Sequence, residues 1–466
     1  MRIGRSVLAV ALISGCAGTS AAPVSRHSES QLPGTLTTQV ADSQCPHGLG
    51  IGVDTAEWIS RAASQGKDFP TLAVAMLANG DTLAVASGAP TPRTAIVAEF
   101  RTPCELNPDF GRGGATQLAF GRQGVSISAV LPMADGGALI AGSTSESNAH
   151  WLVGRLTADG QPDAAFGHDG WASLPWGYTA TALAQMPNGD IVVGGDGNEN
   201  GSSYTSELTS DGGLVRSFGV AGRTRMPPWH DGGVQGVWVE PSGNILAIVG
   251  GGNSGCWGVI AVELTPTGER VSGFARRFQR GLHQAVPTAG ARFPFIVFVG
   301  DIAVEPDGFH LIGTAQNTCV DNGLPRPNPT QRIRDVAFGY DGSLDTSFGE
   351  NGVTSFPAPI ADAAWAFPQA DGDTLLVTSP DASDRNHVGR KGYADLLVYR
   401  LTHSGALDTT YAHDGVADLS FPDNADNCAS DEVGAQPVSN GRQVEIATTT
   451  ASGNAIVLSP VPSSTG

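Results

Sequence analysis

The sequence predicts an all-β fold made of seven copies of one four-stranded antiparallel unit, and three repeated features predict it. A short glycine turn recurs seven times between alternating apolar runs. A second turn, of the form Leu-Thr-x-x-Gly, recurs in four copies, and an aromatic residue recurs downstream of it. Four short strands in a unit of about 50–65 residues are the size of a propeller blade. We therefore expect a seven-bladed β-propeller.

The first turn joins the first two strands of each copy. Asn-Gly and Asp-Gly favour two-residue hairpin turns, whose central residues need positive φ angles. The runs around the turns, such as Leu72–Leu77, Thr82–Ala86 and Ile191–Val193, alternate as strands do. The turns are Asn79-Gly80, Asp135-Gly136, Asn188-Gly189, Ser242-Gly243, Asp307-Gly308, Asp371-Gly372 and Asn440-Gly441.

The second turn and the aromatic residue place the third and fourth strands. The turn is seen at Leu156–Gly160, Leu208–Gly212, Leu264–Gly268 and Leu401–Gly405. A fourth strand, such as 352–356, follows the aromatic. A β-helical solenoid is the alternative fold, but its coils are shorter and its strands parallel. The aromatic residues are Phe110, Phe166, Phe218, Phe274, Phe348 and Tyr411.

The segment Asp341–Val353, which reads Asp-Gly-Ser-Leu-Asp-Thr-Ser-Phe-Gly-Glu-Asn-Gly-Val, resembles the delta-60 repeat of bacterial β-propellers. Six recognisable copies and a remnant cover nearly all of the chain after its leader. The fourth copy departs most, with Ser272–Ala275 in place of Ser-Phe-Gly. The resemblance implies a propeller in an exported protein and brings no established activity or catalytic residues.

The ends of the chain predict how the ring closes. The seventh copy begins at Asn440, and its third strand, Ala455–Leu458, leaves no room for a fourth. Near the other end, Leu49–Val53 loosely repeats the missing Gly-Val piece. We expect this N-terminal strand to complete the last blade of a propeller spanning 45–462, so that no strand edge stays open.

The N-terminus predicts export. Residues 1–15 read as a signal peptide, with Arg2 and Arg5 before a short apolar run. The end of this segment resembles the lipobox of bacterial lipoproteins, with Cys16 as the lipidated residue, and 16–44 reads as a flexible tether. We expect an outer-membrane or cell-surface lipoprotein. The alternative is cleavage near Ala22, which would leave a periplasmic or secreted protein.

The charge of the chain excludes one class of partner. The formal net charge is −19, from 45 acidic and 26 Lys and Arg residues. Nucleic-acid binding needs many cations to neutralise phosphates, so we expect no nucleic-acid partner. Contact with a membrane is expected through the lipid anchor alone.

Five cysteines follow Cys16, and an oxidising compartment permits disulfides. Cys256 and Cys319 fall in equivalent loops of neighbouring copies. Cys45 and Cys104 both precede fourth strands of neighbouring copies. These two pairs are the predicted disulfides, and Cys428 is left over.

Two long loops predict a basic ligand-binding rim. Both join second to third strands, and loops on rigid scaffolds often carry function. In an acidic protein such a rim would attract an anionic glycan or an acidic envelope protein. The plainer interpretation is solvated loop arginines. Loop 313–334 supplies Arg326, Arg332 and Arg334, and loop 379–394 supplies Arg385, His387, Arg390 and Lys391.

One loop fits the spacing of a calcium site. Oxygen ligands at its first, third, fifth and twelfth positions, around a glycine turn, can wrap a hard cation. The plainer interpretation is a polar hairpin loop, because the flanking helices of such sites are absent. The predicted ligands are Asp196, Asn198, Asn200, Ser202 and Glu207, and calcium is the only cofactor that the sequence suggests.

No hydrolase or phosphate-binding motif is present. We therefore expect a non-catalytic binding scaffold in the bacterial cell envelope. The alternative is a glycosidase or lyase that uses carboxylates such as Asp231, Asp301 or Asp362 at the central funnel. A third possibility is an assembly factor that docks envelope proteins.

Overall fold

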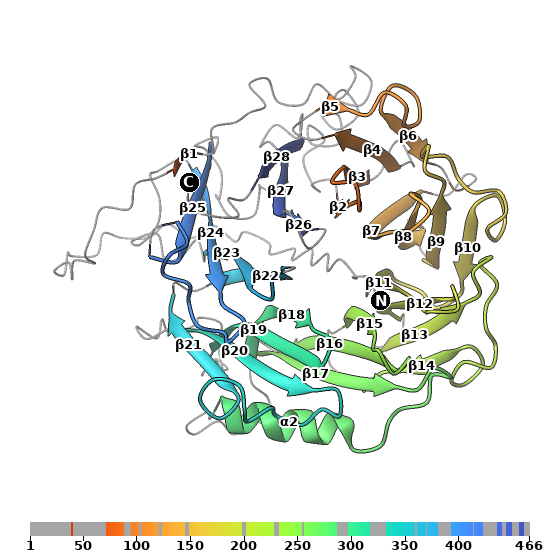
Figure 1. Ribbon diagram of the computed structural model, residues 1–466. Helices are drawn as coiled ribbons and strands as arrows, with labels where there is room; N and C mark the ends of the chain where they lie inside the picture. The colour runs from red at the N-terminus through yellow and green to blue at the C-terminus, as the bar shows by residue number, and fades with distance from the viewer. Residues whose placement is uncertain are drawn as a thin grey trace, which may run out of the picture.

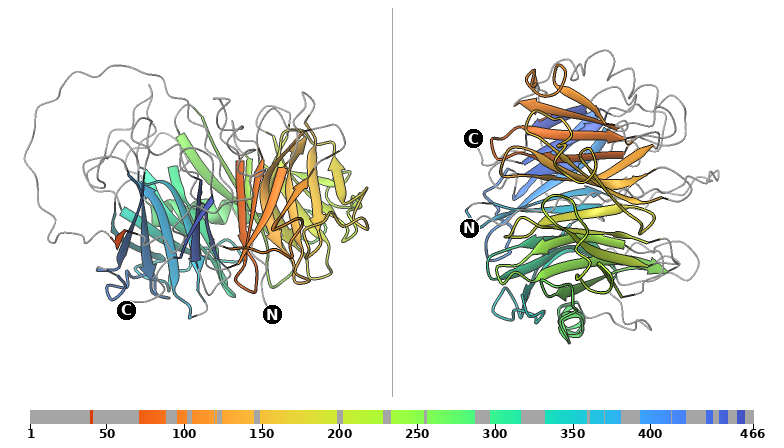
Figure 2. Two further views of the ribbon diagram at one scale, coloured as in Figure 1. Left: turned by 90° about the horizontal axis from the view of Figure 1, so that it is seen from above. Right: turned by 90° about the vertical axis from the view of Figure 1, so that its right-hand side faces the viewer.

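The chain folds as an all-β propeller. Its computed structural model describes residues 39–40, 71–87, 95–101, 105–118, 120, 124–144, 149–197, 202–227, 233–253, 256–286, 297–316, 332–358, 361–369, 371–380, 393–412, 414–422, 436–439, 444–449 and 456–460. The sheets stand around a central axis, with β2, β7, β11, β15, β18, β22 and β26 nearest to it (Figure 1). The side views show neighbouring sheets standing next to one another (Figure 2).

The described strands form seven sheets in chain order. The first sheet holds β2 (Thr71–Met76), β3 (Thr82–Ser87), β4 (Ala95–Arg101), β5 (Glu105–Leu106) and β6 (Ala115–Leu118). The second holds β7 (Val125–Pro132), β8 (Ala138–Thr144), β9 (Trp151–Leu156) and β10 (Trp171–Leu174). The third holds β11 (Ala180–Gln185), β12 (Ile191–Asp196), β13 (Ser203–Leu208) and β14 (Arg223–Arg225).

The remaining four sheets follow the same order. The fourth holds β15 (Gly233–Val239), β16 (Ile245–Asn253) and β17 (Cys256–Leu264), followed by the helix α2 (Phe274–Ala285). The fifth holds β18 (Val297–Val304), β19 (Gly308–Gln316), β20 (Arg332–Gly339) and β21 (Val353–Pro357). The sixth holds β22 (Ala361–Pro368), β23 (Thr374–Pro380), β24 (Tyr393–Leu401), β25 (Val416–Pro422) and β1 (Gln39–Val40). The seventh holds β26 (Gln436–Ser439), β27 (Val444–Thr449) and β28 (Ile456–Pro460).

Two features differ from the predicted unit. The fourth sheet has three described strands, and α2 begins at the aromatic Phe274, so the prediction of a strand directly after this aromatic is wrong in the fourth copy. Within the predicted tether, β1 pairs in parallel with the outer strand β25. No described helix is long and apolar enough to cross a membrane. The predicted closing strand, 49–53, lies outside the described residues.

The hairpin turns also differ in type from the prediction. In the first sheet the amide of Gly80 donates to the carbonyl of Leu77 at 3.0 Å, so Ala78 and Asn79 are the central residues of the turn. Gly80 comes after them, with φ of 95°. This is a three-residue hairpin in which the glycine takes the left-handed position, and such a loop accommodates the twist of the strands. The equivalent glycines 136, 189, 243 and 372 also have positive φ angles.

Successive sheets are joined by a contact that is described for five pairs of neighbours, here called the clasp. The recurring aromatic of one sheet packs against the glycine of the second turn in the next, so closely that a Cβ at Gly268 would stand 2.8 Å from the ring of Phe218. Beside it, the amide of Gly219 donates to the carbonyl of Thr267 at 2.8 Å. The described pairs are Phe110 with Gly160, Phe166 with Gly212, Phe218 with Gly268, Phe274 with Gly342, and Phe348 with Gly405.

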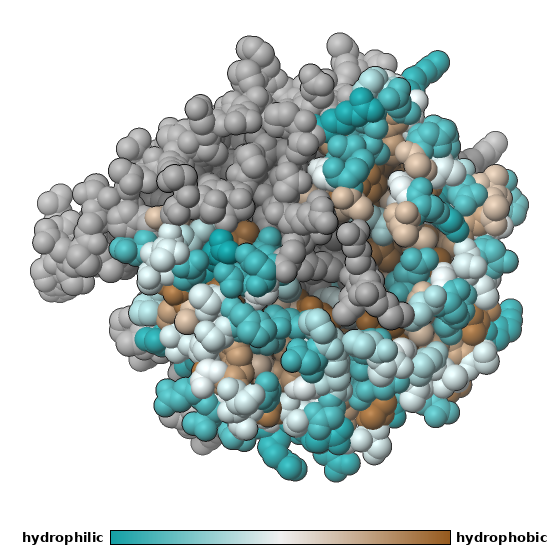
Figure 3. Space-filling view, in the orientation of Figure 1, coloured by the Kyte–Doolittle hydropathy of each residue, from teal (hydrophilic) through white to brown (hydrophobic). Residues whose placement is uncertain are grey.

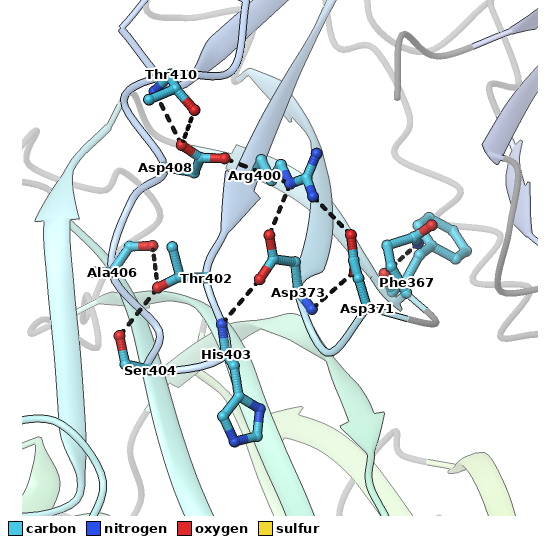
Figure 4. Close-up of polar contacts among 11 residues, drawn as sticks. Phe367, Asp371, Asp373, Arg400, Thr402, His403, Ser404, Ala406, Asp408 and Thr410 are labelled. Atoms are coloured by element: carbon cyan, nitrogen blue, oxygen red, sulfur yellow. Dashed lines mark hydrogen bonds and ion pairs between the residues drawn. The ribbon is translucent and has the colours of Figure 1, made fainter. Parts of the chain in front are cut away.

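Within a sheet, an arginine on the third strand ties the two turns together. Arg400 on β24 forms ion pairs with Asp371 at 2.7 Å and Asp373 at 2.9 Å (Figure 4). Asp408, beyond the second turn, lies 3.5 Å from the same guanidinium. Arg155 in the second sheet is paired in the same way, with Asp135 at 2.7 Å and Asp163 at 3.3 Å. These scaffold arginines are compensated by carboxylates.

A buried carboxyl group precedes the first turn of the fourth sheet. Glu240, at the end of β15, is 3% exposed, and among the described residues its Oε1 atom has no hydrogen-bond partner. Its Oε2 accepts from the Ser242 hydroxyl at 3.1 Å. Burial, together with the charge of Glu263, raises the pKa of Glu240 to about 7.

This pKa makes stability fall as pH rises. Between the unfolded pKa of 4.5 and the folded value of about 7, the folded state holds more protons than the unfolded state, so the free energy of unfolding decreases with pH. We expect Glu240→Gln to flatten this decrease and to stabilise the protein at pH 8 by on the order of 3 kcal/mol. Urea unfolding from pH 4.5 to 8 measures it. The exposed Glu269→Gln is the control, and an unchanged pH slope in Glu240→Gln would contradict the assignment.

Candidate anion-binding site

Two arginines project from one face of the third sheet's outer strand. On β14, Arg225 lies opposite Tyr204 of β13, and Arg223 lies opposite Ser206. Residues two apart on a strand share a face and stand about 7 Å apart, so the two guanidinium groups leave the sheet side by side. Arg225 is exposed and Arg223 is half-buried.

Aromatic rings fix the position of Arg223. Its guanidinium carbon lies 4.5 Å from the ring centre of Trp176 and 4.4 Å from that of Tyr204. Cation–π contacts of this kind hold a guanidinium in place while its N–H groups remain able to donate in their own plane. Trp176 belongs to the link between β10 and β11. Tyr178 on the same link is 59% exposed.

A third arginine reaches this place from the fourth sheet. Arg270 follows β17, and its guanidinium donates to the backbone carbonyl of Arg225. Arg225 itself donates to the Ser202 hydroxyl at 3.1 Å. We call Arg223, Arg225 and Arg270, with Trp176, Tyr204 and Ser202, the arginine site.

The charges of this site have no ion-pair partner among the described residues. Burial and the neighbouring charge of Arg225 lower the pKa of Arg270. Within the described part of the chain, no acid forms an ion pair with Arg223, Arg225 or Arg270. The scaffold arginines Arg155 and Arg400, by contrast, are each held by two or three carboxylates. An anion bound between Arg225 and Arg270 would supply the missing negative charge.

Sequence reasoning missed this site, although one signal for it was present. One residue after each second turn forms a β-bridge back to the end of the third strand. In the fourth sheet this residue is Arg270, whereas the equivalent residues in the other sheets are Pro162, Leu214, Leu344 and Leu407. An alignment of the copies would have marked Arg270 as the exception. The contact between Arg270 and Arg225 crosses two sheets, and no sequence pattern predicts it.

The predicted calcium loop does not hold together as one site. Asp196 lies opposite Ser203, whereas Glu207 lies opposite Val192, four residues further along β12. That separation is about 13 Å, so Asp196 and Glu207 cannot share an ion, and the prediction that both are its ligands is wrong. Ser202 accepts from Arg225 instead. Asn198 and Asn200 lie outside the described residues, among which no group of three His, Cys, Asp or Glu side chains could hold a metal.

Asp196 has a different environment from the one expected. Its backbone carbonyl accepts from the Trp151 ring nitrogen at 2.8 Å, and its amide donates to Thr179 at 2.9 Å. Its Oδ1 atom packs on Gly233 and, among the described residues, has no hydrogen-bond partner. Burial raises the pKa of Asp196 to about 6.

The predicted basic rim is described only in part. Arg332 and Arg334 lie on strand β20 and not in a loop, because β19 extends to Gln316 and β20 begins at Arg332. Arg332 donates to the hydroxyl and carbonyl of Ser355 at 3.0 and 2.8 Å, which ties it to β21. Arg326, Arg385, His387, Arg390 and Lys391 lie outside the described residues, as do Cys16, Cys45, Cys104, Cys319 and Cys428. Both disulfides therefore stay predictions.

Comparisons with known proteins find likeness in fold only. No protein-family model matches the chain. No curated protein matches it either. Among solved structures, hydrazine synthase of Kuenenia stuttgartiensis aligns at 10% identity and a TM-score of 0.45, over 85% of this chain and 98% of its own. The GH93 α-L-arabinofuranosidase of Fusarium graminearum aligns at 10% and 0.38, over 84% and 92%. The β-propeller domain of the Trilobed protease of Pyrococcus furiosus aligns at 8% and 0.35, over 70% and 79%.

The two kinds of arginine should respond differently to replacement. We expect Arg270→Gln to lower the melting temperature by less than Arg400→Gln at about 0.01 M salt, because the variant loses the hydrogen bond to the Arg225 carbonyl but also relieves the repulsion between two like charges. At about 0.5 M, where salt screens that repulsion, the loss in Arg270→Gln should be slightly larger. Arg400→Gln removes a compensated arginine and should lower the melting temperature by a few degrees at both. Thermal unfolding followed by circular dichroism measures this. Equal losses in the two variants would make Arg270 a scaffold residue.

Proposed function

We propose that the protein is an exported binding protein that holds an anionic envelope glycan at the arginine site. The observation that carries the proposal is the contrast between arginines in one molecule. Arg155 and Arg400 are neutralised by nearby carboxylates, whereas Arg225 and Arg270 are brought together from two sheets without a described acid. Exposed, uncompensated guanidinium groups suit the carboxylate or sulfate of an acidic sugar.

The scaffold in this proposal is a closed ring of seven blades. Support comes from the seven described sheets and from the contact between β2 of the first sheet and β26 of the seventh. The seventh sheet has three described strands, and residues 49–53 would supply its fourth. The resemblance of the repeats to the delta-60 family is part of the same proposal.

The location in this proposal is the outer membrane or cell surface, with Cys16 carrying the lipid. Support comes from the sequence of the leader alone. We expect Cys16→Ser to move the protein from the membrane fraction to the soluble fraction and to abolish incorporation of labelled palmitate. Fractionation of cells that express either form measures this. Equal labelling of both forms would favour the alternative, in which cleavage near Ala22 removes Cys16.

An enzyme of glycosidase or lyase type is the second candidate, and Asp196 is the residue that favours it. A carboxyl group with a pKa near 6 can exchange protons with a substrate at neutral pH. Such chemistry needs a second carboxyl group, and the sequence supplies Asp231 in the segment 228–232, outside the described residues. Release of reducing ends or unsaturated sugars from an acidic polysaccharide, lost in Asp196→Asn, would favour this candidate.

Binding tests the first candidate directly. We expect trigalacturonate to bind the full-length protein, most tightly at low salt, and neutral maltotriose not to bind. Arg225→Gln should weaken trigalacturonate binding by about tenfold, because it removes one charge-assisted contact. Isothermal titration calorimetry measures both. Arg112→Gln, an exposed arginine of the first sheet, is the charge-matched control, and an equal loss in this variant would refute the site.

A further inference from the structure

The helix α2 is the one helix among the described elements, and the residues on its buried face explain why this segment is helical. Phe274, Phe278 and Leu282 recur every four residues and are all fully buried. This spacing places them on one face of a helix. Against the fifth sheet, the ring of Phe278 lies 4.7 Å from that of Phe338. Against the fourth, Gln279 donates to the carbonyl of Val259 at 2.8 Å.

Arg277 on α2 has a structural role, because its side chain joins the helix to the fifth sheet. In the earlier sheets a backbone amide, such as that of Gly219, donates to the carbonyl of the next sheet's second turn. Because α2 begins at Phe274, no described backbone amide at the corresponding position makes this hydrogen bond. The guanidinium of Arg277 replaces it, donating to the carbonyl of Asp341 at 2.7 Å.

The outer face of α2 presents two further arginines. Arg276 and Arg280 are exposed and four residues apart, so they stand about 6 Å apart along one side of the helix. Like charges at this spacing weaken a helix. No described acid forms an ion pair with either. In the space-filling view, hydrophilic side chains project from the lower edge, where Figure 1 places α2 (Figure 3).

These arginines continue the arginine site along the outer wall of the ring. Arg270 contacts Arg225 of the third sheet and precedes Arg276 by six residues. Figure 1 places β14 and α2 at the outer edge of neighbouring sheets. Arg225 on β14, Arg270 after β17, and Arg276 and Arg280 on α2 are here called the arginine track, and none of them has an ion pair with a described acid. It crosses from the third sheet to the fourth on a protein whose net charge is −19.

From this track we infer that the ligand is a linear polyanionic glycan, laid across two blades, and not a single acidic group. The inference rests on the proposed function and adds to it the length of the ligand and the path that it takes. A chain with a negative charge on every sugar can pair with successive arginines at once. Each further contact is then made within one complex and raises the overall affinity without any new partner.

The test compares short and long ligands on the full-length protein. We expect an oligogalacturonate of about twelve residues to bind at least tenfold more tightly than trigalacturonate, since it reaches the whole track. Arg276→Gln with Arg280→Gln should weaken the long ligand by about tenfold and leave trigalacturonate unchanged. Arg225→Gln should weaken both. Arg101→Gln with Arg112→Gln, exposed arginines of the first sheet, is the control of equal charge.

The possible outcomes separate the two proposals. If long and short ligands bind equally well, or if the α2 double variant keeps the length dependence, the track is overturned while the arginine site stands. If trigalacturonate fails to bind and Arg225→Gln changes nothing, the proposed function itself fails. If polyphosphate of the same charge binds α2 more tightly than the glycan does, the choice of a glycan is overturned. Circular dichroism of each variant establishes that α2 still forms.

Discussion

The clasp between successive sheets is the contact on which the rest of the structure depends. A ring that packs on a glycine leaves no space for a side chain, so each sheet can approach the next at one distance and one rotation. The hydrophobic clusters between sheets, such as the one that joins Leu139 and Val153 to Leu183 and Val193, form at that spacing. The positions of the outer walls follow from it, and with them the meeting of Arg225 and Arg270.

The arginines show how one residue type serves two purposes in one fold. Where carboxylates surround the arginine, as around Arg400, ion pairs fix the side chain and neutralise its charge within the protein. Where no described carboxylate forms an ion pair, as around Arg270, the repulsion from Arg225 is not offset in this way. An anion that binds at such a place relieves a repulsion that the free protein carries, and this relief adds to the favourable free energy of binding.

The sequence was sufficient for most of the strands and insufficient for the site. Repeated turns and aromatics predicted hairpins, third strands and a fourth strand at 352–356, which is observed as β21 at Val353–Pro357, because each depends on residues that are neighbours in the chain. The helix α2 was missed because the copy-to-copy comparison suggested a strand, although Phe274, Phe278 and Leu282 carry the helical spacing. The arginine site was missed because Arg270 and Arg225 are 45 residues apart and meet only once two sheets have packed. The prediction that Asp196 and Glu207 share a calcium ion was wrong because Asp, Asn and Gly at this spacing also favour ordinary hairpins.

The position of α2 beside β17 has a consequence for local opening of the fourth sheet. The outer edge of β17 has no described ladder of backbone hydrogen bonds, and the side chain of Gln279 donates to one of its carbonyls, that of Val259. In the second, third, fifth and sixth sheets, a described fourth strand must separate before the edge amides of the third strand meet solvent. In the described part of the fourth sheet, the helix α2 stands in that place. The edge amides of β17 should therefore exchange with deuterated water before those of β9, β13, β20 and β24.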